Sequence, residues 1–202
     1  MNRSLLLITV LILSSLFTSS KSSAYGSYSR SSSFGGDGVG WLVMPQGIYY
    51  FTNDTQGTTN NSTNRYIFDA SAGYHFELFY LGAEFNYDLI QTSSSGNPTN
   101  SNVYKSYGVQ VGIMTGGWML LGSYFVLSTA TSNVSGSPVD YTGGTGYQIL
   151  GGYLWDIGSG FNIGPEFLYR SLTYTSRADG KPIGSNYTFS TMAPQIGVKY
   201  MF

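Results

Sequence analysis

The chain contains no cysteine and few charged side chains, and both absences narrow the classes of protein to consider. Without cysteine there is no disulfide, no thiolate metal site and no cysteine nucleophile. Only 9% of the 202 residues are charged, against about 25% in ordinary soluble domains. A net charge of -1 supplies no basic field for nucleic acid. The composition therefore disfavours a soluble domain and a nucleic-acid partner.

Outside the N-terminus, the chain also lacks an apolar run long enough for a transmembrane helix. The apolar run at residues 5–13 follows the cation Arg3, and small residues such as Ser22 and Ala24 follow it. A short apolar run in this setting is typical of a secretory signal peptide. We therefore expect a cleaved signal peptide at 1–24, a flexible periplasmic segment at 25–39, and one folded domain at 40–202.

Aromatic residues are abundant, at 16% of the chain, and apolar and polar residues alternate with a period of two. In residues 65–77, for example, Tyr66 and Phe68 share one face, and Ile67 and Asp69 share the other. Such alternation over about 9–11 residues predicts a tilted membrane strand. Eight strands are expected, at residues 43–52, 65–77, 79–91, 103–114, 118–129, 144–156, 161–171 and 192–202. Residues 118–129 are apolar on both parities, so their facing stays open.

The connections between these segments alternate between short turns and long polar stretches. The long stretches, rich in the turn formers Ser, Thr, Asn and Gly, are residues 53–64, 92–102, 131–144 and 176–186. Short turns at one end, long loops at the other and an even strand count are typical of outer-membrane barrels. The sheet must close, with the last strand pairing against residues 43–52, because an open edge in hydrocarbon leaves backbone groups unpaired.

The sequence therefore predicts an all-β fold: a closed antiparallel eight-stranded transmembrane β-barrel with up-and-down meander topology. The alternative, a soluble sandwich or lipocalin-like barrel, requires a polar outward face. Here the polar face is the glycine-rich one, which suits the narrow lumen of an eight-stranded barrel.

The chain ends in alternating apolar and aromatic residues, Ile196, Val198, Tyr200 and Phe202. With the signal segment and the eight alternating strands, this ending resembles the small eight-stranded bacterial outer-membrane barrels, the OmpA/OmpX/OmpW-like superfamily. The resemblance implies a bacterial outer-membrane location and outer-membrane lipid as a partner. It also implies that the four terminal residues form the assembly signal read by the barrel-assembly machinery. No motif singles out one subfamily.

The inward parity collects polar side chains that we expect to form a cluster in the lumen. They are Glu84, Gln110, Glu166, Arg170, Gln195 and Lys199. A lone carboxylate in a narrow lumen is costly, so we expect Arg170, Lys199 and the amides to satisfy the two glutamates in a polar plug. The alternative is a narrow passive pore, because charged rings tune conduction. Its solutes would be small and possibly apolar.

Catalytic groups are sparse. His75 is the only histidine, and outer-membrane lipid A deacylases place a serine two residues from their histidine, where this chain has Glu77. Asp69 and Asp88 lack the loop spacing of a calcium site. We therefore expect no enzyme, no metal and no cofactor, with a lipid-modifying enzyme as the weakest alternative. The expected role is envelope structure or surface contact through the loops, whose partner the sequence does not specify.

Overall fold

The computed structural model describes residues 39–56, 59–94, 99–134, 136–181, 183 and 185–202. The expected signal peptide, and the flexible segment up to residue 38, lie outside the described residues. Among the described residues, no helix is long and apolar enough to cross a membrane.

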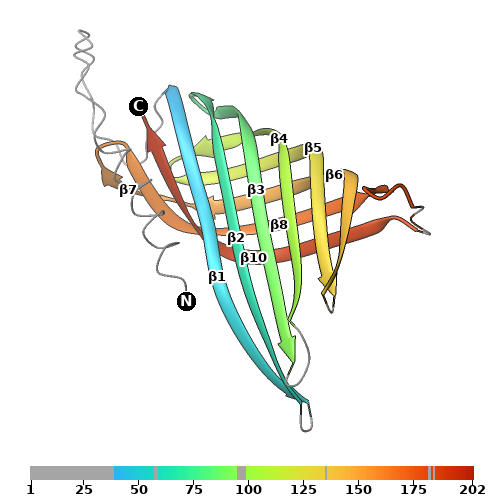
Figure 1. Cartoon of the computed structure of the whole chain (residues 1–202). Helices are drawn as coiled ribbons and strands as arrows, with labels where there is room; N and C mark the ends of the chain where they lie inside the picture. Colours follow the sequence, from blue (N-terminus) through green and yellow to red (C-terminus); the bar gives the residue numbers. More distant parts are fainter. Residues whose placement is uncertain (1–38, 57–58, 95–98, 135, 182, 184) are drawn as a thin grey trace, which may run out of the picture. The chain divides into compact units, whose positions relative to one another are not determined.

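The described chain is built from β-strands arranged as a closed meander (Figure 1). The strands are β1 (Gly40–Gln56), β2 (Thr59–Phe76), β3 (Phe79–Ser94), β4 (Asn100–Thr115), β5 (Trp118–Val134), β6 (Ser137–Tyr153), β7 (Trp155–Gly158), β8 (Phe161–Tyr174), β9 (Ser176–Arg177) and β10 (Tyr187–Met201). Each long strand pairs antiparallel with the next, and β10 returns to β1. The predicted eight-stranded antiparallel barrel is confirmed, with β7 and β9 as short pieces beside β8 and β6.

The strands reach further than the sequence predicts. The six strands β1 to β6 have 16 to 18 residues each, whereas a tilted strand crosses the hydrocarbon core in about 9–11. They continue into the described parts of residues 53–64, 92–102 and 131–144, so the prediction of loops is wrong for those parts. The reason is cross-strand pairing of short polar side chains, such as Ser94 with Asn61 at 2.5 Å. Of the described residues in 176–186, only the two that form β9 lie in a strand.

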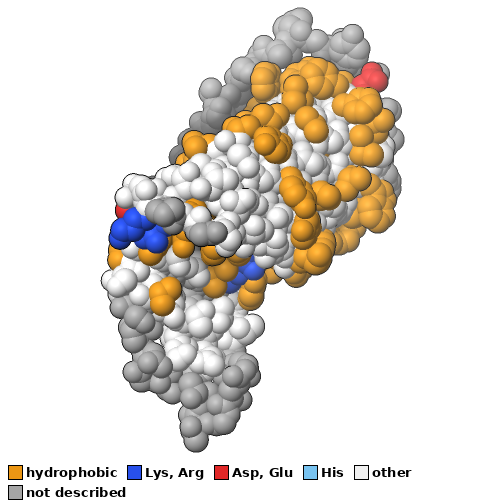
Figure 2. All heavy atoms as spheres, turned by 90° about the vertical axis from the view of Figure 1, so that its right-hand side faces the viewer, with side chains coloured by type: hydrophobic (Ala, Val, Ile, Leu, Met, Phe, Trp, Pro, Cys, Tyr) orange, Lys and Arg blue, Asp and Glu red, His pale blue; other side chains and the backbone are white. Residues whose placement is uncertain are grey.

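The outward face of the barrel is apolar and exposed. Trp41, Phe79, Trp118 and Phe202 are 60%, 61%, 66% and 67% exposed. Figure 2 shows hydrophobic side chains gathered over one part of the surface, with mostly other groups toward its opposite end. A soluble protein rarely exposes apolar area on this scale, so the barrel spans a membrane with this belt facing lipid. Aromatic rings pair near the short turns, as Phe161 does with Tyr200 at 4.4 Å between ring centroids.

The structure settles the facing of β5 through a bulge. Gly108 pairs with Phe125 and Tyr107 pairs with Leu127, so Val126 is an extra residue in β5. A bulge of this kind reverses the facing of the residues beyond it. The inward side chains before it are Met119, Leu121, Ser123 and Phe125, and those after it are Ser128 and Ala130. In the sequence, β5 is apolar at both odd and even positions. The reason is that its outward side chains belong to the apolar surface and several of its inward side chains belong to the apolar core.

A proline interrupts the strand that the sequence predicts at residues 144–156. In an antiparallel ladder, every second residue directs its N–H and C=O to the same neighbouring strand. The bond from Met201 N to Gly160 O puts the even-numbered residues of β8 on the side of β10, so Pro165 faces β6, and proline has no N–H to donate. β6 ends at Tyr153, which this register would place opposite Pro165, and β7 begins at Trp155. Asp156, predicted to face inward, is exposed in β7 and accepts a bond from the N–H of Gly158 at 2.8 Å.

The seam between β1 and β10 closes the barrel over a short stretch only. The pairs run from Leu42 with Met201 to Gly47 with Ile196, with a gap opposite Pro45. The backbone N–H of Phe202 donates to the carbonyl of Trp41 at 3.1 Å. Because every second residue of a strand directs its backbone groups to the same neighbour, the odd-numbered residues of β1, including Pro45, direct theirs to β10. Closure is confirmed here, but not along the whole predicted stretch 43–52.

Pro45→Ala is therefore expected to stabilise the barrel. The substitution restores one seam donor, and a net backbone hydrogen bond contributes about 0.5–1.5 kcal/mol, partly offset by the greater entropy of the unfolded chain. The measurement is the midpoint of urea unfolding in lipid vesicles. Pro138→Ala at the tip of β6, where the side chain is exposed, is the control. A lower midpoint for Pro45→Ala would contradict the assigned facing.

Candidate functional site

Polar side chains inside the barrel divide its buried apolar residues into two clusters. The larger one is Leu42, Met44, Ile67, Tyr80, Met114, Met119, Leu121, Leu150, Leu154, Leu168 and Ala193. The smaller one is Tyr104, Phe125, Ala130, Leu172 and Tyr174. These buried side chains occupy the interior of the barrel, as expected for eight strands.

The centre of the polar network is the ion pair between Arg170 of β8 and Asp69 of β2. Arg170 Nη2 lies 2.7 Å from both Oδ1 and Oδ2 of Asp69. The exposure of the two side chains is 0% and 1%. Asn86 Nδ2 donates to Asp69 Oδ1 at 2.6 Å, and the guanidinium lies 5.9 Å from the Phe125 ring centroid. A charge this deeply buried is tolerated because each partner is neutralised and hydrogen-bonded by the other.

A second ion pair lies beside the first and joins β2 to β3. Arg65 Nε donates to Asp88 Oδ1 at 2.9 Å, and Arg65 Nη2 lies 2.5 Å from Asp88 Oδ2. Arg65 Nη1 also donates to the Tyr50 hydroxyl at 2.9 Å. Asp88 Oδ2 lies 3.7 Å from Arg170 Nη1, so the two pairs form one network.

Amide side chains extend this network to Glu84. Arg170 Nε donates to Gln148 Oε1 at 2.8 Å, and Gln148 Nε2 donates to Glu84 Oε1 at 2.7 Å. Gln110 Nε2 donates to Glu84 Oε2 at 3.0 Å, and the Ser123 hydroxyl donates to the same oxygen. Three strands, β4, β5 and β6, thus supply the groups that bond this carboxyl of β3, which fixes their inward side chains relative to one another.

Glu166 occupies a separate polar patch near the seam. Gln195 Nε2 lies 3.2 Å from Glu166 Oε2 and 3.1 Å from Gln46 Oε1, which joins β10 to β8 and β1. A Cβ built on Gly197 would collide with the Glu166 carboxyl group, so this glycine provides the space that Glu166 occupies. Gln195 therefore bridges the closing strands of the barrel.

The predicted lumen residues fall into three places. Glu84, Gln110 and Arg170 belong to the central network, Glu166 and Gln195 to the seam patch, and Lys199 to the short-turn end. The expected neutralisation of the two glutamates by Arg170 is wrong, because the arginine pairs with aspartates from β2 and β3. Sequence reasoning missed Asp69, Asp88 and Arg65 as network members, although the alternation placed both aspartates on the inward face.

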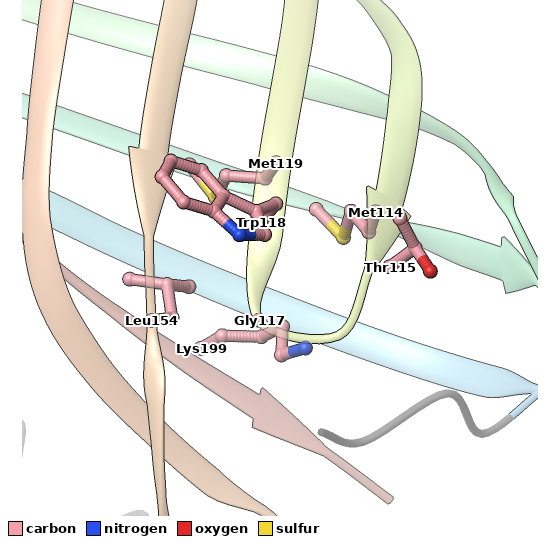
Figure 3. A pocket seen from close by; sticks show the side chains of 7 residues that line it. All are labelled: Met114, Thr115, Gly117, Trp118, Met119, Leu154 and Lys199. Atoms are coloured by element: carbon pink, nitrogen blue, oxygen red, sulfur yellow. The ribbon is translucent and has the colours of Figure 1, made fainter. Parts of the chain in front are cut away.

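A small recess at the short-turn end contains Lys199. Figure 3 shows this side chain below the turn between β4 and β5, and the lining residues are Met114, Thr115, Gly117, Trp118, Met119, Leu154 and Lys199. The recess has a volume of about 10 Å³, near the minimum that one water molecule needs. It is too small to admit a substrate.

The described part of the chain offers few groups for metal binding or catalysis. Among the described residues, no three His, Asp or Glu side chains lie close enough to hold a metal ion. His75 is buried in β2, whereas Glu77 is exposed in the following turn with φ of 54°. The alternation of residues 65–77 predicts that Glu77 shares the inward face of Ile67 and Asp69, and this is wrong because the turn ends the alternation.

The comparisons with known proteins yield structural similarity alone. No protein-family model and no curated protein sequence matches the chain. Neisserial surface protein A has a TM-score of 0.46 at 14% identity, covering 80% of this chain and 96% of that one. Outer membrane protein OprG from Pseudomonas aeruginosa has 0.39 at 12%, covering 81% and 96%. Outer membrane protein AlkL in DMPC bilayers has 0.41 at 10%, covering 90% and 97%. These scores lie below 0.5, so the fold assignment rests on the strand pairing of this chain.

Proposed function

We propose that the chain is a non-catalytic integral protein of a bacterial outer membrane whose lumen is plugged. Its role is envelope structure, or contact with other molecules through the long-strand end, which is the end of the barrel opposite the short turns, where strands β1 to β6 extend. The observation that carries the proposal is the central network: Arg170, Asp88 and Asn86 have no exposed surface. Ions and solutes would have to break two buried ion pairs to pass, which costs several kcal/mol.

Outer-membrane lipid and, during insertion, the barrel-assembly machinery are the partners we propose. Phe202 is 67% exposed, and its ring lies 5.4 Å from that of Tyr200. Outward aromatic side chains at a strand end are favoured at a membrane interface. Both rings are thus presented on the outer surface of the closing strand, where a membrane-embedded insertion factor would contact them.

Liposome swelling tests the plug against the pore. Vesicles that contain the refolded protein are diluted into isotonic arabinose, and we expect the same swelling rate as for empty vesicles. A 16-stranded general porin serves as the positive control. Swelling at a rate proportional to the amount of protein would reject the plug in favour of a passive pore, and altered lipid A masses in expressing cells would reject the non-catalytic assignment.

A further inference from the structure

The seam between β1 and β10 leaves two strand edges unpaired. Beyond Gly47 and Ile196, the described residues provide no ladder partner on the seam side for β1 as far as Gln56, or for β10 from Gln195 back to Tyr187. On their other sides both strands are paired, β1 with β2 to Gln56 and β10 with β8 to Tyr187. Figure 1 shows β1 and β10 diverging from the seam.

Pro194 accounts for the point at which the pairing ends. The bond from Phe202 N to Trp41 O places the even-numbered β10 residues, Pro194 included, on the seam side. In a continued ladder, Pro194 would donate its N–H to the carbonyl of Tyr49, and proline has no N–H. Two prolines, Pro45 and Pro194, thus lie on opposite sides of the same seam and limit it to the short-turn half of the barrel.

The free edge of β1 is already ordered for pairing. Residues 48–52 are Ile, Tyr, Tyr, Phe and Thr, all strong strand formers. The Tyr49 hydroxyl donates to Asn64 Oδ1 at 3.0 Å, and its ring lies 4.5 Å from that of Tyr66. On the inward face, Tyr50 accepts a bond from Arg65. Because β2 holds both tyrosines, a partner strand would not have to order this edge.

Natural edge strands are usually protected by lysine, proline or a bulge. Residues 48–52 contain neither lysine nor proline, and their pairing with β2 runs without a register shift. The edge also extends past Phe51, the last exposed aromatic side chain of β1, to Gln56. Residues 52–56 are all polar in the sequence, which favours a position beyond the apolar belt.

We propose that the free edge of β1, residues 48–56, binds an extended polypeptide segment of another protein by antiparallel strand addition. The edge presents backbone donors and acceptors at every second residue, a repeat of about 6.6–6.8 Å that an extended peptide matches. The inference rests on the proposed function in one respect: the long-strand end must face the cell exterior. It names the chemical class of the surface partner.

The test uses full-length protein refolded in detergent micelles and a fluorescent peptide that copies residues 187–193. This segment would meet residues 50–56 if the β1–β10 register continued past Pro194. One control peptide carries N-methyl groups at the positions of Thr188, Ser190 and Met192, which face β1 in that register. A second is N-methylated at the positions of Tyr187, Phe189 and Ala193, which face away. We expect the unmodified and second peptides to bind and the first to lose binding.

The same experiment includes two variants at one edge position. Phe51→Pro deletes a seam-facing N–H and should weaken peptide binding about five- to tenfold, the equivalent of one net hydrogen bond. Phe51→Ala removes the ring but keeps the N–H, and it should bind within about twofold of the parent. Proline is tolerated at edge positions, and heat-modifiable gel mobility confirms that each variant folds.

Amide hydrogen exchange supplies an independent readout. Without peptide, the Phe51 amide should exchange faster than the β2-facing amides of Tyr50 and Thr52, and peptide should slow it. The Tyr49 amide, whose partner in this register would be position 194, lies beyond the peptide and should not be slowed. Equal binding of the two methylated peptides, or no binding of any, would overturn the proposal. Two further results would overturn it. Slower exchange of the Phe51 amide at higher protein concentration would indicate that a second copy covers the edge. Slower exchange in lipid bilayers without peptide would indicate that lipid covers it. Liposome swelling with intact peptide binding would reject the plug and leave this inference standing.

Discussion

Arg170→Ala is expected to lower the free energy of unfolding by about 3–5 kcal/mol. The substitution leaves Asp69 as an uncompensated charge, with the side chain 1% exposed and the amide of Asn86 as its remaining donor among the described side chains. It also removes the donor to Gln148 Oε1, so Gln148, which donates to Glu84, is held less firmly. Urea unfolding in lipid vesicles, followed by tryptophan fluorescence and gel mobility, measures the loss.

The chain offers an exposed ion pair as the matched control. Arg177 Nη2 lies 2.8 Å from Asp179 Oδ2, and the side chains are 27% and 41% exposed. Arg177→Ala should change stability little, because solvent screens exposed pairs. The double variant Asp69→Leu with Arg170→Met should recover much of the loss, since it removes both charges. Equal losses for Arg170→Ala and Arg177→Ala would contradict a buried network.

Gly197→Ala is expected to destabilise the barrel by about 1–3 kcal/mol, the usual cost of overpacking. The added Cβ would collide with the Glu166 carboxyl group, which then loses its bond from Gln195 or shifts the strand. The cost falls on the seam, where β10 has few ladder bonds to β1. The same unfolding assay measures the effect.

Gly122→Ala is the control for this substitution. Gly122 lies in β5, and a Cβ built there has one neighbouring atom within 4 Å, the Val111 carbonyl oxygen at 3.9 Å. We expect no loss of stability for this variant. Glu166→Ala combined with Gly197→Ala should remove the collision and restore part of the stability. A larger loss for Gly122→Ala than for Gly197→Ala would contradict the assigned inward face of β10.

The period-two alternation predicts much of the fold. Tyr66 and Phe68 are exposed while Ile67 and Asp69 are buried, as the pattern requires. Facing follows from sequence alone because each residue in a strand alternates sides. The exception is β5. The bulge at Val126 exchanges which positions face inward, and apolar side chains lie on both faces of the strand, so its sequence does not show which face is inward.

The partners of the inward side chains depend on register, which alternation does not encode. Arg170 and Asp69 are 101 residues apart and meet only because the strands are staggered around the barrel. Counting residues from the short turns cannot supply that stagger, so no pattern in the sequence favours pairing Arg170 with Asp69 over Glu166. The sequence shows Pro45, Pro165 and Pro194, but not which backbone pairing each proline prevents. That depends on the neighbouring strand to which each proline would have directed an N–H.

Single-channel recording across planar bilayers tests the closed lumen most directly. The refolded protein is added at increasing concentration with a potential of either sign, and insertion is verified by heat-modifiable mobility of protein recovered from the membrane. Two buried ion pairs and the two apolar clusters fill the barrel. We therefore predict no discrete current steps from the parent protein. Steps of defined size from inserted parent protein, altered in Glu84→Ala or Arg170→Ala, would contradict the plugged barrel and establish a conducting pore.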